Sequence, residues 1–185
     1  MEILEAIHTR QSIPTVKPDQ VPKELVEKIL SAAVQAPNHH RVRPWRFIVL
    51  EGSTRERLGE VMVQSLLKRQ PDVKAEILEI ERAKPLRAPL LIVVGVDKPA
   101  DLKVVEIENV CAAAAATQNL LLAAHGLGLG AYWRTGPAAY DPEVKAFLGF
   151  AQDQHLIAFL YIGYPVAEFT LHQRPGYEDR TTWME

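Results

Sequence analysis

The amino-acid sequence predicts one domain of mixed helices and strands, arranged around a long buried helix. Segment 109–124 consists almost entirely of alanine and leucine, so such a helix must be covered on nearly every face. Two apolar runs, 89–96 and 155–163, have the length and composition of strands. The chain has 185 residues, of which 48% are hydrophobic, and this is enough for one sizeable core.

The N-terminal part of the chain is predicted to be helical. Apolar residues with helical spacing indicate a short first helix, which Pro14 stops and which presents Arg10, Gln11 and Ser12 at its end or just beyond it. A second amphipathic helix is predicted to begin near Pro22, a favourable first-turn residue, and to end before the next proline-containing loop.

A strand and a capped helix follow this loop. Residues 36–45 form a polar loop, and the apolar run after it predicts a strand at 46–51. Ser53 and Glu56 have the spacing of a capping box, so they should begin the next helix, which ends before Pro71.

The second half of the chain supplies the remaining elements. Segment 72–84 is charged and has high helix propensity, which is typical of a solvated surface helix. The run 89–96 has no polar residue before Asp97, so it is expected in the middle of the sheet. After the long helix we expect a strand at 130–134, a short helix that opens at Asp141, and a last strand at 155–163.

Composition restricts the partners and the location of the protein. The net charge is -2 and there is no basic run, so no nucleic-acid partner is expected. No apolar run approaches the ~20 residues of a membrane span, and we expect a cytoplasmic protein without a membrane partner. Cys111 is the only cysteine, and we interpret it as a small core residue. The polar, proline-containing segment 164–185 is predicted to be an arm that packs on another surface.

Three common types of site do not fit the sequence. Gly126, Gly128 and Gly130 close a helix and precede a strand, whereas a dinucleotide-binding turn follows a strand and opens a helix. No serine lies in a glycine-flanked elbow with histidine and acidic partners. His39 and His40 are adjacent, so their side chains should diverge, and no metal site is expected.

The chain resembles the flavin-dependent nitroreductase family in three motifs that occur in order between residues 1 and about 163. It is most similar to the small branch typified by the YdjA-like NAD(P)H nitroreductases. The first motif follows the short first helix, the second joins a loop to a strand, and the third is the long helix with the strand after it. They consist of Arg10, Gln11 and Ser12; of Ala36, Pro37, Asn38 and His39 leading to Pro44, Trp45, Arg46 and Phe47; and of Gln118 to Ala124 followed by the glycines and Trp133.

This resemblance implies an α+β fold with a central, mainly antiparallel sheet flanked by helices. It also implies a homodimer that holds FMN at two shared active sites, so that residues 1–185 form one FMN-binding domain with 164–185 as a C-terminal arm. In the family, the opening triplet holds the FMN phosphate or ribityl chain, the loop before Pro44 comes from the partner subunit, and the strand tip lines the flavin ring near N5. The cofactor-binding residues carried over are therefore Arg10, Gln11, Ser12, Gln35, His39, Trp133, Arg134 and Thr135.

Two departures from the family pattern concern charge. Gln11 occupies a position that is often basic, and Pro14 occupies the position of a lysine that commonly neutralises charge near flavin N1 and O2. Arg134 or Arg43 could substitute for that lysine. Basic residues near the C-terminus contact the phosphate in larger members, which makes candidates of Arg174 and Arg180.

The activity that the resemblance implies is hydride transfer from NAD(P)H through FMN to a nitroaromatic, a quinone or a similar flat acceptor. Because flavin N5 accepts the hydride, no protein residue is predicted to be catalytic. The alternative is an FMN-binding protein that stores, senses or processes flavin without nicotinamide turnover. Relatives also dehalogenate aromatics or fragment flavin, but residues 66–86 are the only segment long enough to supply a substrate lid.

Overall fold

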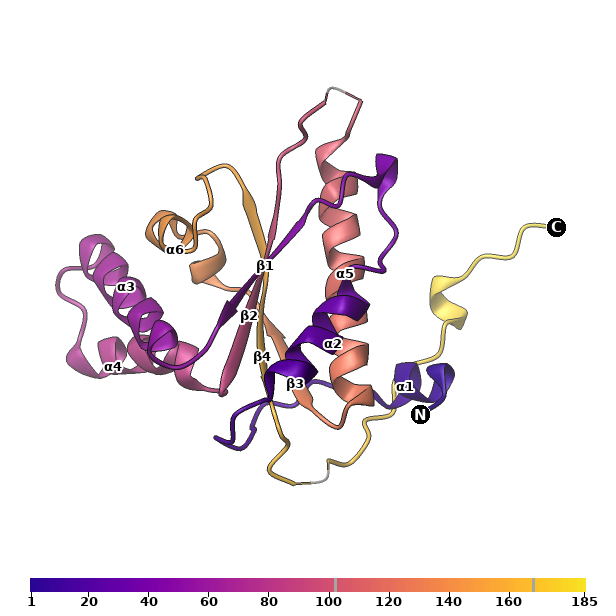
Figure 1. Cartoon of the computed structure of the whole chain (residues 1–185), viewed down its shortest axis with the longest axis horizontal. Coiled ribbons are helices and arrows are strands. Elements are labelled where there is room, and N and C mark those ends of the chain that lie inside the picture. Colours follow the sequence, from indigo (N-terminus) through magenta and orange to yellow (C-terminus); the bar gives the residue numbers. More distant parts are fainter. Residues whose placement is uncertain (102, 168) are drawn as a thin grey trace.

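The computed structural model describes residues 1–101, 103–167 and 169–185, which form a sheet between two layers of helices (Figure 1). The helices are α1 (Ile3–Thr9), α2 (Lys23–Ala33), α3 (Ser53–Arg69), α4 (Ala75–Ala83), α5 (Glu106–Gly126) and α6 (Pro142–Phe147). The strands are β1 (Trp45–Leu50), β2 (Leu90–Val96), β3 (Gly130–Arg134) and β4 (His155–Gly163). Short 3-10 turns occur at η1 (His39–Arg41), η2 (Lys84–Leu86), η3 (Pro137–Ala139) and η4 (Glu178–Arg180).

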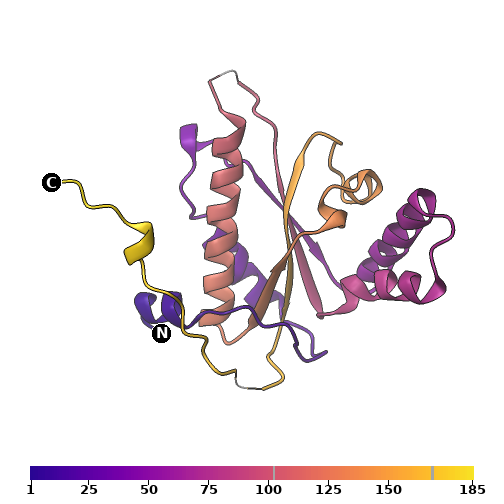
Figure 2. The same cartoon turned by 180° about the vertical axis from the view of Figure 1, so that it is seen from behind.

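The sheet is antiparallel throughout and has the strand order β1-β2-β4-β3. Every residue of β2 is buried, which confirms the prediction of a strand in the middle of the sheet. Figure 2 shows the same sheet from behind, with α2 and α5 on one face and α3, α4 and α6 on the other. The α+β architecture with a central antiparallel sheet, expected from the sequence, is therefore confirmed.

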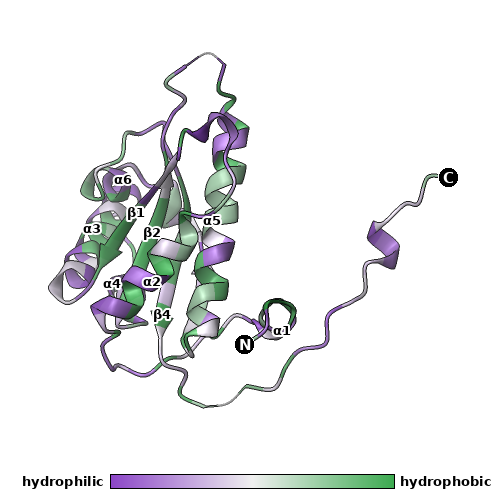
Figure 3. Ribbon diagram, turned by 45° about the vertical axis from the view of Figure 1, so that its right-hand side comes forward, coloured by the Kyte–Doolittle hydropathy of each residue, from purple (hydrophilic) through white to green (hydrophobic). Residues whose placement is uncertain are grey.

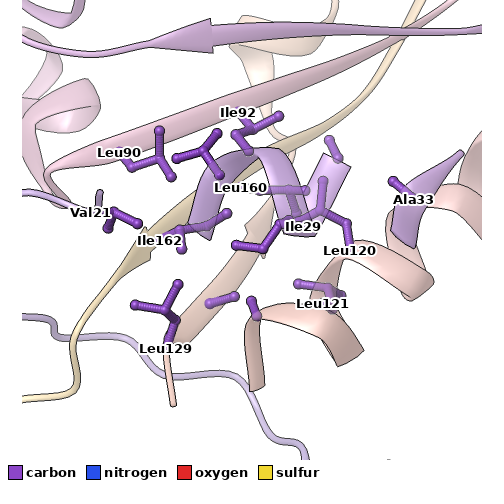
Figure 4. Packing of buried hydrophobic residues seen from close by; sticks show 14 of the residues in the cluster. Val21, Ile29, Ala33, Leu90, Ile92, Leu120, Leu121, Leu129, Leu160 and Ile162 are labelled. Carbon is purple, nitrogen blue, oxygen red and sulfur yellow. The ribbon is translucent and has the colours of Figure 1, made fainter. Parts of the chain in front are cut away.

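Alternation along the strands produces two cores, one on each face of the sheet. Ile92 and Leu160 point to the first face, where they pack with Ile29 of α2 and Leu120 of α5 (Figure 4). Val93, one residue along β2, points to the opposite face and packs against α3 and α6. A central strand that is buried on both faces has a continuous apolar sequence, and this pattern made β2 predictable.

Helix α5 has one face that the chain itself does not cover. Its inner face packs on the sheet and on α2, while Ile107 is 63% exposed and Cys111 is also exposed. Hydrophobic colours follow the central strands and continue along α5 (Figure 3). The interpretation of Cys111 as a core residue is therefore wrong for the single chain, because its side chain lies on the outer face of the helix.

Local signals at two helix ends were also misleading. Gly52, not Ser53, is the N-cap of α3, and no side-chain bond caps this helix, so the predicted capping box does not form. Helix α1 ends at Thr9, well before Pro14, since Ile13 donates its backbone N–H to the carbonyl of Ala131 at the free edge of β3 (3.0 Å). The pairing with β3, not the proline, determines where α1 ends.

A truncation of Leu120 tests the packing of α5 on the sheet. Leu120→Ala should lower the free energy of unfolding by about 3 kcal/mol, because a fully buried leucine leaves a cavity. The control is Ile80→Ala, on the exposed side of α4, which should change stability by less than about 1 kcal/mol. Urea unfolding at one fixed protein concentration measures both, and equal losses for the two variants would contradict the packing described here.

Candidate functional site

The first part of the site is a cavity of about 470 Å³ where the end of α1 meets the C-terminal arm. We call it the basic cavity. It brings Arg10, Gln11 and Ser12 together, as the sequence predicted, and adds Arg174 from the arm. The described residues that line it are His8, Thr9, Arg10, Gln11, Ser12, Pro14, Tyr132, Phe169, Leu171, His172 and Arg174.

Backbone contacts with β3 hold the opening triplet in place. After the triplet, Ile13 pairs with the edge of β3 and packs on Gly130, where an added Cβ would lie only 2.8 Å from the isoleucine side chain. Gln11 contacts the arm through two hydrogen bonds, in which its Nε2 donates to the Thr170 carbonyl (3.2 Å) and its Oε1 accepts from the backbone N–H of His172 (3.4 Å). Gln11 thus joins the triplet to the arm.

The basic cavity has an excess of positive charge. Arg174 donates to the carbonyl of Arg10, so the two guanidinium-bearing side chains come from adjacent positions. Burial, and then the nearby charge of Arg174, lower the pKa of Arg10. Among the described residues that line the cavity none is acidic, and a guanidinium remains charged at neutral pH. An anion such as a phosphate would relieve this repulsion and would accept forked hydrogen bonds.

The second part of the site is a smaller cavity, of about 300 Å³, at the tip of β3. We call it the strand-tip cavity. Gly136, two residues beyond the end of β3 and at the N-cap of η3, has φ +82° and ψ −168°, a backbone conformation that is essentially restricted to glycine. The lining residues are Leu58, Met62, Lys84, Pro85, Arg87, Arg134, Thr135, Gly136, Pro137, Ala138, Phe159 and Tyr161.

The two cavities adjoin at a cation–π pair. Tyr132 lines the basic cavity, Arg134 lines the strand-tip cavity, and the guanidinium carbon lies 4.2 Å from the centre of the tyrosine ring. Residues two apart in a strand point to the same face of the sheet, so β3 presents this pair side by side. The two cavities therefore follow one another along β3, the basic cavity beside Tyr132 and the strand-tip cavity beside Arg134, and we call them together the trough.

Cations also surround the strand tip. Lys84 and Arg87 lie across the cavity from Arg134, and Lys84 is paired with Glu81. Tyr161 lies between them, and burial raises the pKa of its phenol although the two arginines oppose this change. Of the two substitute cations considered in the sequence analysis, Arg134 lines the strand-tip cavity, and Arg43 lines neither cavity of its own chain.

Three of the predicted residues lie outside the trough of a single chain. The indole Nε1 of Trp133 donates to the carbonyl of Ile157 (2.9 Å), and the ring packs on the core shared with α5. Gln35 is exposed at the end of α2, where its Nε2 donates to the carbonyl of Ser31 (3.3 Å). His39 lies beside the N-terminal end of α5. The roles predicted for these three residues therefore stay predictions.

The separation within one chain can be estimated from α5. His39 Nδ1 lies 2.6 Å from Glu108 near the start of the helix, and Thr9 Oγ1 lies 2.8 Å from His125 near its end. Glu108 and His125 are 17 residues apart, which corresponds to about 25 Å at 1.5 Å per residue. The loop that carries His39 is therefore remote from the basic cavity of its own chain.

Sequence reasoning missed several residues of the trough. Tyr132 followed from no motif, although its position one residue before Trp133 places it on the opposite face of β3. Lys84 and Arg87 enter only because the turn η2 lies close to β3 in space, and His172 enters through the arm. Of the two arm candidates, Arg174 lies in the basic cavity, while Arg180 is paired with its neighbour Asp179.

Two further features of the described residues bear on the type of site. His39 and His40 do not diverge, because His40 has φ +52° and the two rings stack with centres 4.1 Å apart. No group of three or more histidine, cysteine or acidic side chains in 1–101, 103–167 and 169–185 is arranged to hold a metal ion. Over the same residues, no helix combines the length and the apolar character needed to cross a membrane.

Comparison with known proteins gives consistent results. The model of the Nitroreductase family matches residues 7–164. "Putative NAD(P)H nitroreductase YdjA" of Escherichia coli K12 is 33% identical over 165 residues, which are 89% of each chain. A nitroreductase-like family protein from Bacillus cereus superposes with a TM-score of 0.86 at 26% identity and covers 100% of this chain and 97% of its own. A "putative nitroreductase in complex with FMN" from Desulfovibrio desulfuricans superposes with a TM-score of 0.72 at 27% identity, over 95% and 92% of the two chains.

Proposed function

We propose, because the chain belongs to the Nitroreductase family, that it is a flavoprotein oxidoreductase that passes a hydride from NAD(P)H through FMN to a flat acceptor such as a nitroaromatic or a quinone. The observation that carries this proposal is the trough along β3, with two arginines at one end and a glycine-terminated strand tip at the other. Flavin phosphates and flavin rings require these two environments at opposite ends of one site.

The basic cavity fits the phosphate of FMN. Arg10 and Arg174 would bind the phosphate oxygens with charged donors, and the hydroxyl of Ser12 would add a neutral hydrogen bond. Gln11, which contacts the arm, would keep Arg174 beside the triplet. The FMN complex of the Desulfovibrio relative supports the same cofactor for this chain.

The strand-tip cavity suits the ring system. When FMN is bound, its N5 atom can accept a hydride from a nicotinamide and pass electrons to an acceptor that takes the same position. Thr135, or a backbone N–H beside it, would hydrogen-bond near N5. Arg134, Lys84 and Arg87 would stabilise the negative charge that the ring gains on reduction, because all three cations line this cavity. Among the described residues, the one carboxylate paired with them is Glu81, which contacts Lys84.

The complete site is proposed to form in a homodimer. Helix α1 buries none of its residues in the single chain, and Ile3 and Leu4 are 72% and 66% exposed. Helix α1, helix α5 and the C-terminal segment 169–185 lie on the same side of the sheet (Figure 1). An exposed apolar surface of this extent marks an interface, and a second copy of the chain would cover it.

An antiparallel pairing of the two α5 helices would also complete the trough. In such a dimer the N-terminal end of one α5 lies beside the C-terminal end of the other, which removes the separation of about 25 Å within one chain. Gln35 and His39 of one subunit would then approach the basic cavity of its partner. On this proposal residues 1–185 act as one FMN-binding domain with the arm as part of the interface.

The first test is the visible spectrum of the purified protein. After FMN addition and removal of excess, the protein should be yellow, and NADH or NADPH should bleach the flavin band within seconds under anaerobic conditions. A flat acceptor should then restore the band. A protein that retains FMN but reacts slowly with both nicotinamides would instead be a flavin-storing or flavin-sensing protein, and a colourless protein would reject the whole proposal.

Replacement of Arg10 tests the phosphate end. Arg10→Ala should weaken FMN binding by about 1.5–3 kcal/mol, because a charge-assisted hydrogen bond is lost. Fluorescence titration of the apoprotein with FMN measures this change. Arg57→Ala, an exposed arginine on α3, is the matched control and should bind FMN as the unmodified chain does. If the two variants bind equally well, Arg10 does not hold the phosphate.

Replacement of Ala114 tests the shared site. Ala114 lies on the outer stripe of α5 with Ile107 and Cys111 and lines neither cavity. Ala114→Arg should yield monomers in analytical ultracentrifugation and should raise the Kd for FMN about tenfold or more, equivalent to about 1.4 kcal/mol. Ala146→Arg, on the exposed side of α6, should change neither quantity. A monomeric variant with unchanged FMN affinity would contradict a site built from two subunits.

A further inference from the structure

The loop Asn38–Arg43 is a basic segment that lines neither cavity of its own chain. We call it the basic loop. It carries His39, His40, Arg41 and Arg43, all of them exposed. Within 1–101, 103–167 and 169–185, the only carboxylate that contacts these four side chains is Glu108, which pairs with His39. Two arginines and a histidine therefore project without an acidic partner among the described residues.

Hydrogen bonds hold the basic loop at both ends. At its start, the side chain of His39 lies 2.6 Å from Glu108 of α5. At its end, the backbone N–H of Arg43 donates to Asn38 Oδ1 (2.9 Å), and the carbonyl of Pro44 accepts from the N–H of Asp97 (2.7 Å). The loop is therefore closed on itself and tied to α5 and to the segment after β2.

Three residues of the basic loop have a strained backbone conformation. His40, Arg41 and Arg43 have φ of 52°, 56° and 52°, which is the left-handed region that side-chain-bearing residues seldom adopt. No glycine is used at these positions, although glycine would remove the strain. A surrounding structure that maintains such strain is typical of ligand-binding segments.

We propose that the basic loop of one subunit binds the phosphate groups of the nicotinamide dinucleotide while that dinucleotide occupies the partner's flavin site. This inference rests on the proposed function, since it requires the dimer in which the loop approaches the partner's trough. The guanidinium groups of Arg41 and Arg43 are suited to forked contacts with phosphate oxygens. The flavin phosphate is already provided for by Arg10 and Arg174, so the additional cations match a second phosphorylated ligand.

The chemistry of the loop also excludes a polyanion. The chain has a net charge of -2, and no basic surface continues from the loop along the sequence in either direction. A nucleic-acid footprint would require such a continuous basic surface. A ligand with two or three phosphates, such as NADH with its pyrophosphate or NADPH with an additional 2'-phosphate, fits a patch of this size better.

The experiment compares two charge-removing double variants of the FMN-loaded protein. Arg41→Gln/Arg43→Gln removes the loop arginines, and Lys23→Gln/Lys28→Gln removes two exposed lysines of α2 as a matched control. Stopped-flow reduction gives the apparent Kd and the limiting rate for NADPH and for NADH. Calorimetric titration with adenosine 2',5'-bisphosphate measures phosphate binding without any turnover.

The loop variant should raise the apparent Kd for NADPH about tenfold while the limiting rate of flavin reduction stays unchanged, and the control should leave both unchanged. An effect on NADPH alone, together with weaker binding of adenosine 2',5'-bisphosphate, identifies the 2'-phosphate as the bound group. An equal effect on NADPH and NADH identifies the pyrophosphate. Arg41→Lys/Arg43→Lys keeps the charge and should recover most of the affinity.

Four results would overturn this inference. Unchanged Kd values for both nicotinamides would show that the loop does not contact the dinucleotide. Weaker retention of FMN by the loop variant would assign the loop to the flavin phosphate instead. A decrease in limiting rate without a change in Kd would indicate a structural role. If neither nicotinamide reduces the unmodified protein, the proposed oxidoreductase function fails. The loop proposal is rejected separately if the loop variant binds adenosine 2',5'-bisphosphate as tightly as the unmodified protein does.

Discussion

The arrangement of the molecule depends on helix α5, which packs one face on the sheet and leaves the other uncovered. Its inner face is built from small residues that allow close contact with α2, and Asn119 reinforces this contact through a hydrogen bond from Nδ2 to the carbonyl of Ala32 (3.3 Å). Because the helix is long and straight, groups at its two ends cannot meet within one chain. The proposed site shared between two subunits follows from this single constraint.

The edge of β3 is the second determinant of the site. Period-two alternation places Ala131 and Trp133 against the core and Tyr132 and Arg134 toward the trough. The segment after α1 pairs with the same edge and carries the opening triplet with it. A short strand therefore aligns two sequence motifs that are more than a hundred residues apart.

Most of the fold could be predicted from the sequence because the elements are locally consistent. The apolar run of β2 and the Asp141 cap of α6, which accepts from two backbone N–H groups, both depend on nearby residues alone. The incorrect predictions depended on distant contacts. Gly52 occupies the N-cap position that was predicted for Ser53. Cys111 is exposed because an apolar helix need not be fully covered by its own chain.

The site was less predictable than the fold for the same reason. The opening triplet and the strand tip were recognisable because each is a contiguous motif, and the resemblance supplied their roles. Lys84 and Arg87 precede β2 without any pattern that marks them, and they reach the strand-tip cavity only because η2 packs against α3. Trp133 illustrates the opposite case, since a motif position that suggested ligand contact is occupied by a side chain that packs in the core.

The charge of the trough shows why net charge is a poor guide to the function of this protein. The chain is slightly acidic overall, yet Arg10 and Arg174 gather at one end of the trough and Arg134, Lys84 and Arg87 at the other. Electrostatic interactions of exposed groups are screened beyond about 8 Å at physiological ionic strength, so remote acidic residues do little to offset these clusters. In the basic cavity, burial and then the nearby charge of Arg174 lower the pKa of Arg10. A ligand that is anionic at one end and gains negative charge at the other relieves both repulsions, and flavin mononucleotide undergoing reduction has this distribution of charge.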